Sequence, residues 1–129
     1  MIEDKKIGIR PIINIVSEDE RMSFSEKFQN QTLRPVIKLQ HDLLIHIFKQ
    51  HATSRKQILK NLSDQKLMLF IHNVMQKDLQ FKALIIGLIV GHFTVDEYTE
   101  YKAFSSEINR RIFSIVTQRI QDSLQELKD

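Results

Sequence analysis

Apolar residues recur at steps of three and four along most of this chain, and this spacing constrains the fold more than any other feature. In the first half they form a clear stripe, consisting of Leu33, Val36, Ile37, Leu43, Leu44, Ile47 and Phe48. Because an α-helix turns once every 3.6 residues, positions at these steps share one face of a helix. The same spacing returns between residues 95 and 127. The sequence therefore predicts an all-α fold.

The composition agrees with a helical chain held together by an apolar core. The 129 residues include no cysteine, three glycines and two prolines. The lack of cysteine excludes disulfides, thiolate catalysis and cysteine zinc sites. The scarcity of glycine and proline disfavours β-sandwiches, β-barrels and glycine-rich phosphate loops, all of which need tight turns. A length of 129 residues corresponds to about one domain.

Polar residues mark where several helices start. Ser23 and Glu26 have the spacing of a capping box, in which hydroxyl and carboxylate each satisfy a free backbone N–H, and this predicts a helix beginning near Phe24. Thr94 and Glu97 form a second box. Serine and aspartate caps predict two further starts, at Ser63-Asp64 and at Asp78.

Pro35 interrupts the first helix. Proline has no N–H, and its ring crowds the carbonyl of Gln31, four residues earlier. Either the helix kinks there, or Thr32 caps a new helix with Pro35 in its first turn. Beyond this point the apolar stripe predicts a helix ending near Ala52.

Further along we expect a short helix capped by Thr53 or Ser54, a second helix from about Asp64, and a helix from Asp78 to Val90. The last of these is apolar almost all round, so it should be enclosed at the centre. A long final helix should run from about Val95 to Leu127, roughly 45 Å at ~1.5 Å per residue, with part of it overhanging. The prediction is an irregular bundle of four to five helices with a kinked first helix and a long C-terminal helix.

Residues 1–21 show no helical stripe and are expected to be an extended or disordered N-terminal arm, followed by a single helical domain at 22–129. The longest apolar stretch, 83–91, has nine residues. A membrane-spanning helix needs about 20. No secretory signal is recognisable at the N-terminus either, so we expect a cytoplasmic protein.

The chain carries a net charge of +3, and its basic residues are unevenly distributed. Residues 22–62 contain seven Lys and Arg against two acids, whereas residues 94–129 contain five against seven. The densest cluster is a candidate basic patch of Lys49, Arg55, Lys56 and Lys60. We expect a solvated helix face here, because no aromatic residues are interleaved with these basic residues to stack on bases. A nucleic-acid footprint is the alternative.

The histidines do not have metal-binding spacing. His41, His46 and His51 are five residues apart, whereas two ligands on one helix need a spacing of three or four. Asp42 and His46 have that spacing, and His41-Asp42 is a doublet, but no further ligand cluster accompanies them. We therefore predict surface or packing histidines, no metal, no cofactor and no catalytic residue.

Two other groups of residues suggest contacts. Gly87 and Gly91 lie four apart on one helix and let a second backbone approach closely. With Ile108 and Ile112 they form a candidate seam, for helix packing in the core or, as the second possibility, for a homodimer. Near the Pro35 kink, the side chains of Asn30, Gln31, Arg34 and His41 form a candidate polar patch, whose simplest role is an internal hydrogen-bond network.

Two segments carry a resemblance. The stretches 26–40, EKFQNQTLRPVIKLQ, and 91–98, GHFTVDEY, resemble a family of short all-helical bacterial proteins, some of which bear the name glyoxalase. The resemblance covers most of the chain after residue 17. Through that name it implies metal-dependent lyase chemistry as one possible function. The family has no motif tied to chemistry, so no catalytic or metal-binding residue is transferred.

These features predict a non-enzymatic protein-interaction or self-assembly module that forms a homo-oligomer, with a dimer as the simplest form. The first alternative is a small basic regulatory protein that binds nucleic acid. The second is a metal-dependent glyoxalase-like lyase. No membrane association is expected.

Overall fold

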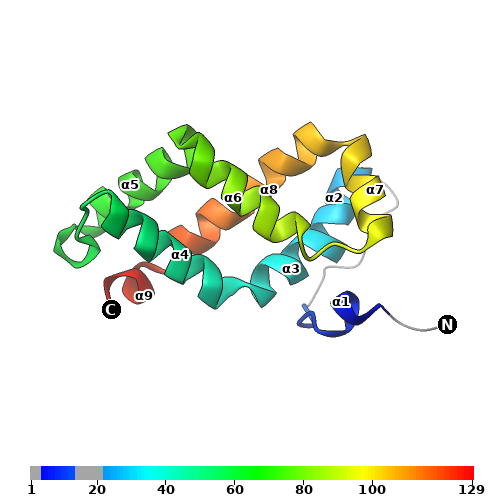
Figure 1. Cartoon of the computed structure of the whole chain (residues 1–129), viewed down its shortest axis with the longest axis horizontal. Coiled ribbons are helices and arrows are strands. Elements are labelled where there is room, and N and C mark those ends of the chain that lie inside the picture. The colour runs from blue at the N-terminus through cyan, green and yellow to red at the C-terminus, as the bar shows by residue number, and fades with distance from the viewer. Residues whose placement is uncertain (1–3, 14–21) are drawn as a thin grey trace.

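The computed structural model describes residues 4–13 and 22–129 of the chain. Within these ranges all regular elements are helices, which confirms the all-α class (Figure 1). They are α1 (Lys5–Gly8), α2 (Phe24–Phe28), the π-helical segment η1 (Gln29–Leu33), α3 (Arg34–Leu39), α4 (His41–Ser54), the 3-10 segment η2 (Leu59–Asn61), α5 (Asp64–Lys77), α6 (Leu79–Val90), α7 (Val95–Ala103), α8 (Ser105–Gln121) and α9 (Leu124–Lys128). If α2, η1 and α3 are counted as one kinked helix, the described residues form six helices of seven or more residues. The predicted number of four to five helices was therefore too low.

The first helix starts and kinks as predicted. The Ser23 hydroxyl accepts a hydrogen bond from the Glu26 N–H at 3.2 Å, so Ser23 is the N-cap of α2. The second bond of the predicted capping box, from the Ser23 N–H to the Glu26 carboxylate, is not formed. The kink lies in η1, where the Arg34 N–H bonds to the carbonyl of Gln29, five residues back. This wider turn accommodates Pro35, which can neither donate a hydrogen bond nor tolerate a carbonyl close to its ring.

Thr32 does not cap a new helix. It is buried within η1, and its hydroxyl donates to Glu97 Oε2 at 3.0 Å. The helical stripe breaks instead at Gln40, so that α3 and α4 are separate helices. The buried Gln40 side chain donates to the carbonyl of Leu88 at 3.0 Å and so ties this break to α6.

The expected short helix after α4 is absent from the described residues. Thr53 and Ser54 lie in the last turn of α4 and do not cap a helix of their own, and only the three-residue η2 follows. The next start is confirmed, because the Ser63 hydroxyl accepts from the Lys66 N–H at the beginning of α5.

The expected single helix from Val95 to Leu127 is wrong. It begins at the predicted capping box of Thr94 and Glu97, but it divides into α7, α8 and α9. The breaks fall at Phe104, whose backbone leaves the helical region (φ −134°, ψ 33°), and at Asp122-Ser123. Each break turns the chain back onto the body, so α9 packs against α4 and η2. The apolar residues thereby bury more surface than one overhanging helix would.

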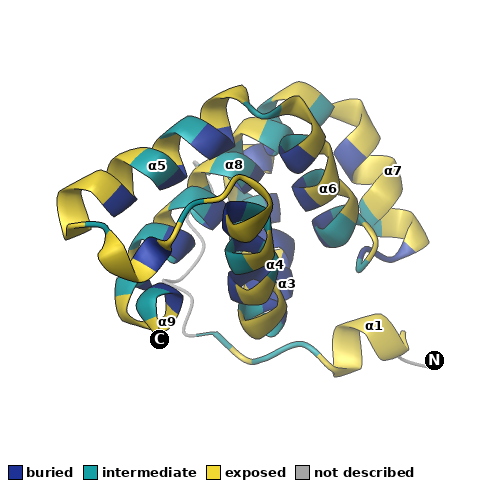
Figure 2. Cartoon of the chain, turned by 60° about the vertical axis from the view of Figure 1, so that its left-hand side comes forward, coloured by how far each residue is buried: buried dark blue, intermediate teal, exposed yellow. Residues whose placement is uncertain are grey.

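The centre of the bundle is α8, whereas α6 was expected there. Four residues of α8 at steps of four are fully buried, namely Ile108, Ile112, Val116 and Ile120. α8 packs against both α5 and α6 and passes behind α6 in Figure 1. In α6 only one side is buried, and residues such as Leu79 (77% exposed) and Leu84 (47% exposed) face outward. Figure 2 shows this alternation of buried and exposed positions along the helices.

The described part of the N-terminal arm forms one helical turn, α1, with Asp4 as its N-cap. The expectation of an extended segment is therefore wrong for Lys5–Gly8. Residues 1–3 and 14–21 of the expected arm lie outside the described ranges. None of the helices within those ranges has the length and apolar character needed to cross a membrane.

Candidate functional site

The predicted polar patch is brought together in part. Arg34 and His41 line one pocket of about 390 Å³ against α8 and the α8–α9 turn. Asn30 supports the pocket from outside, because its Oδ1 accepts from Arg34 Nε at 3.3 Å. Gln31 does not line this pocket. The patch is thus a small polar depression between the first helix and α8.

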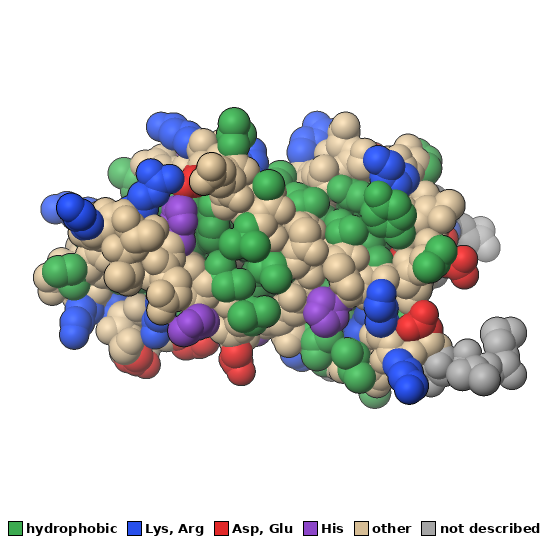
Figure 3. All heavy atoms as spheres, in the orientation of Figure 1, with side chains coloured by type: hydrophobic (Ala, Val, Ile, Leu, Met, Phe, Trp, Pro, Cys, Tyr) green, Lys and Arg blue, Asp and Glu red, His purple; other side chains and the backbone are tan. Residues whose placement is uncertain are grey.

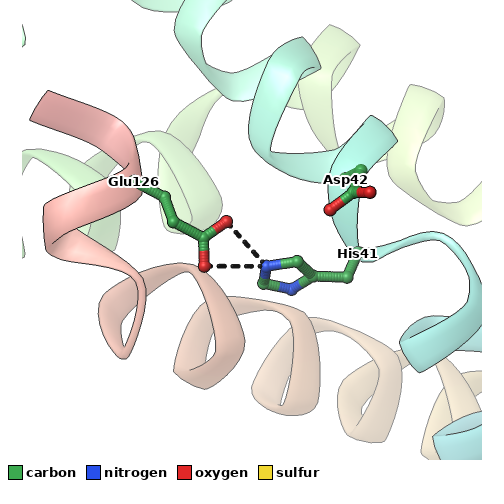
Figure 4. A group of neighbouring side chains, drawn as sticks. All are labelled: His41, Asp42 and Glu126. Atoms are coloured by element: carbon green, nitrogen blue, oxygen red, sulfur yellow. Dashed lines mark hydrogen bonds and ion pairs between the residues drawn. The ribbon is translucent and has the colours of Figure 1, made fainter. Parts of the chain in front are cut away.

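His41 reaches a residue that the sequence did not connect with it. Its Nε2 lies 3.1 and 2.9 Å from the two carboxylate oxygens of Glu126 on α9. Figure 4 shows these two side chains facing each other, with Asp42 next to His41. In the part of the chain that the structure describes, these three form the one group whose ligand atoms lie close enough for a metal ion, all within 4.8 Å.

The surroundings of His41 favour a hydrogen bond over a metal ligand. Arg119 Nη1 lies 3.3 Å from His41 Nδ1. Because a guanidinium can only donate, Nδ1 must accept, so the proton sits on Nε2 and is donated to Glu126. A metal would need the Nε2 lone pair and would move that proton to Nδ1, facing Arg119. The arrangement therefore ties α9 to the start of α4.

A second polar cluster surrounds Asp78, the predicted cap of α6. Its Oδ1 accepts from the Phe81 N–H at 3.0 Å, and its Oδ2 lies 2.5 Å from Arg55 Nη2 and 3.1 Å from His51 Nε2. The hydrogen bond from the Phe81 N–H is the main cause that lowers the pKa of Asp78, and Arg55 adds to it against the opposing effect of burial. The His51 ring stacks on Phe81, with ring centroids 4.5 Å apart. His51 is thus a packing histidine, as predicted.

The candidate basic patch divides into two parts. Arg55 is drawn to Asp78, whereas Lys49, Lys56 and Lys60 line a pocket of about 450 Å³ on another side of the α4 terminus. Lys128, which the sequence did not associate with them, lines the same pocket. Three of the four predicted residues therefore share one concave site.

The candidate glycine seam also divides. Ile108 and Ile112 are fully buried in the core. Gly87 is exposed, and a Cβ added to it would meet no atom within 4 Å. A Cβ on Gly91 would come 3.0 Å from the Gly87 carbonyl oxygen, a contact within the same turn. The prediction that Gly87 packs closely against another helix in the core of this chain is therefore wrong.

The most extensively bonded polar group was missed by the sequence. Arg10 Nη1 and Nη2 donate to the two oxygens of Glu97 at 2.7 and 2.8 Å, and the two side chains are only 6% and 13% exposed. Glu97 also accepts from the Thr94 N–H and from the Thr32 hydroxyl. Arg10 Nη2 and Lys6 Nζ donate to the carbonyls of His92 and Phe93.

This cluster holds the N-terminal segment on α7. Burial alone would raise the pKa of Glu97, but the hydrogen bonds from Arg10 and Thr94 and the charge of Arg10 outweigh it and hold that pKa below its ordinary value. The capping box was visible in the sequence because Thr94 and Glu97 are three residues apart. Arg10 is 87 residues away, and no local pattern marks it as a partner.

Comparisons with known protein families, curated proteins and solved structures find no match to this chain. The resemblance to the bacterial family stays a prediction.

Proposed function

We propose that this chain is a non-enzymatic self-assembly module that forms a homodimer through the outer face of α6. We define the α6 outer face as Leu79, Ala83, Leu84 and Gly87, all of which are exposed. The observation that carries the proposal is an apolar helix with one open side. α6 has a single charged residue, Lys82, and its ammonium lies over the Phe113 ring of α8 at 4.7 Å from the centroid.

The absence of charge on this face supports a second copy as the occupant. A partner of a different kind would usually be selected by several charges or hydrogen-bonding groups, whereas Gln80 is the one exposed polar side chain of α6, beside the α6 outer face. A two-fold axis through such a face places the same apolar residues opposite each other, and most homo-oligomers are two-fold dimers. Gly87, which has open space around it, lets two helices approach closely.

The neighbouring surface extends the apolar area. Leu43 on α4 is half exposed, and Gln40 at the start of α4 is bonded to the carbonyl of Leu88 on α6. Figure 3 shows hydrophobic side chains gathered over α4 and α6 in the middle of one face. Fully burying an exposed leucine contributes about 1.5–3 kcal/mol, and the half-exposed Leu84 contributes about half of that. A symmetric contact counts each leucine twice. Leu79 and Leu84 are therefore the residues expected to contribute most.

The test is the molar mass in solution, measured by light scattering at micromolar concentration. The wild type should have twice the 15.3 kDa mass of one chain. Leu84→Arg should be monomeric, because it places a cation in the interface. The control is Leu69→Arg on α5, another exposed leucine (60%) that lies outside the α6 outer face and should leave the dimer intact.

Gly87→Leu separates folding from assembly. Because a Cβ at this position meets no atom of its own chain within 4 Å, the variant should fold normally and lose only the dimer. A monomeric wild type, or a dimer that survives both Leu84→Arg and Gly87→Leu, would contradict the proposal.

A further inference from the structure

A lysine-lined pocket lies where the end of α4, η2 and the end of α9 meet. We call it the lysine pocket and define it by Lys49, Lys56, Lys60 and Lys128. Its volume is about 450 Å³, and its apolar wall is formed by Ile58, Leu59 and Leu127. Lys and Arg side chains surround this end of the molecule, on the left in Figure 3.

The positive charge of the lysine pocket is only partly compensated. Lys49 Nζ donates to the main-chain oxygen of Asp129 at 3.1 Å, and Lys128 Nζ donates to Asp64 at 2.7 Å. The ammonium groups of Lys56 and Lys60 have no hydrogen-bond acceptor or ion-pair partner among residues 4–13 and 22–129. Asp129 is the acid that lines the pocket. Two uncompensated ammonium groups at one concavity create a positive potential that attracts an anion.

The backbone of Lys56 is an independent sign that its side chain has a role. Lys56 has φ = 59°, the one positive φ of a non-glycine residue in the described ranges. It follows the last turn of α4, where its N–H bonds to the carbonyl of Thr53 and the Gln57 N–H bonds to that of Ala52. This helix ending favours glycine, because a Cβ disfavours the left-handed conformation. A lysine is present where glycine would be the more stable choice.

The shape of the site indicates the size of the ligand. Arg55, the remaining residue of the predicted basic patch, is paired with Asp78 and does not line the pocket. The charges are therefore gathered in a concavity and do not continue as the stripe that a nucleic-acid backbone requires. Ile58, which is 56% exposed, offers an apolar surface next to the ammonium groups. Lysine binds phosphate as a compact point charge.

We infer that the lysine pocket binds a small phosphate monoester, with the phosphate between Lys56 and Lys60 and an apolar or aromatic group against Ile58. This site is separate from the α6 outer face and does not depend on dimer formation. The inference gives these lysines a binding role, whereas on a solvated helix face they would have none.

Calorimetric titration with phenyl phosphate and with inorganic phosphate tests this inference. The wild type should bind phenyl phosphate more tightly than phosphate, because only the ester has a group for the apolar wall. Lys56→Gln should weaken binding about tenfold, as expected for the loss of one charge-assisted contact. Lys102→Gln, which removes an exposed lysine of α7, should leave the affinity unchanged.

Lys56→Gly distinguishes a ligand-binding role from a structural one. It should raise the melting temperature by about 2–4 °C, because glycine relieves the left-handed backbone, and should still weaken binding about tenfold. The inference is overturned if phenyl phosphate gives no binding heat. It is also overturned if Lys56→Gly binds phenyl phosphate as tightly as the wild type does. A third contradicting result is an oligonucleotide that binds more tightly than phenyl phosphate and whose binding is weakened as much by Lys102→Gln as by Lys56→Gln.

Discussion

Replacing Glu97 by glutamine should destabilise the protein more than any other single charge removal on α7. Glu97 accepts four hydrogen bonds, two of them from Arg10, one from the Thr94 N–H and one from the Thr32 hydroxyl. Glutamine keeps one acceptor oxygen but replaces the other by an NH₂ group. That NH₂ faces donors, so at least one of the four bonds is lost and the ion pair disappears.

The expected cost is about 2–3 kcal/mol. A hydrogen bond to a charged group contributes about 1.5–3 kcal/mol net, and breaking a buried ion pair costs about 3–5 kcal/mol. The expected cost is below that of breaking a fully buried ion pair because α1 and Arg10 can detach from α7 and return to water. For a chain of this size, such a loss lowers the melting temperature by roughly 6–12 °C.

Urea unfolding at several pH values tests this prediction. The folded-state pKa of Glu97 is lowered, so its stabilisation is fully present above the unfolded-state pKa of about 4.3 and is lost as the pH falls through the folded-state pKa. The difference between wild type and Glu97→Gln should therefore be constant from pH 7 to about 5 and shrink below about 4. Glu100→Gln, at an exposed position of α7, is the control for removing a charge and should change stability by less than about 0.5 kcal/mol.

A double-mutant cycle identifies the partner. Once Arg10→Ala has released the N-terminal segment, Glu97→Gln should cost much less than it does in the wild type. The reasoning is refuted if Glu97→Gln costs no more than Glu100→Gln at pH 7, or if its effect is the same at pH 7 and at pH 3.

Two further predictions concern the core and the start of α6. Phe48 is fully buried and packs against Phe70 and Phe81, so Phe48→Ala should cost about 3–5 kcal/mol in urea unfolding, and a cost below 1 kcal/mol would contradict the packing described here. Asp78→Ala should cost about 1–2 kcal/mol because α6 loses its N-cap, whereas Asp78→Asn should cost less because asparagine also caps helices. Equal thermal destabilisation by these two substitutions at Asp78 would show that the cap is not the cause.

The candidate sites were only partly predictable from the sequence. Lys49, Lys56 and Lys60 could be grouped because they are near each other along the chain, but Lys128 joins them only when α9 folds back onto η2. His41 was recognised as a polar candidate, yet its partner Glu126 is 85 residues away. The spacing of Gly87 and Gly91 indicated a surface for close approach, but spacing alone could not tell whether that surface lies inside the chain or outside it.

The helical class and most helix starts follow from the sequence alone. The apolar stripe and the caps Ser23, Ser63, Asp78 and Thr94 depend on residues within about four positions of each other, and such interactions form in almost any helical arrangement. The tertiary structure decided where helices break and which faces stay exposed. The final helix divides at Phe104, and α6 leaves one apolar side open because α8 occupies the centre. Those outcomes depend on how much surface the whole chain can bury at once, which no local pattern records.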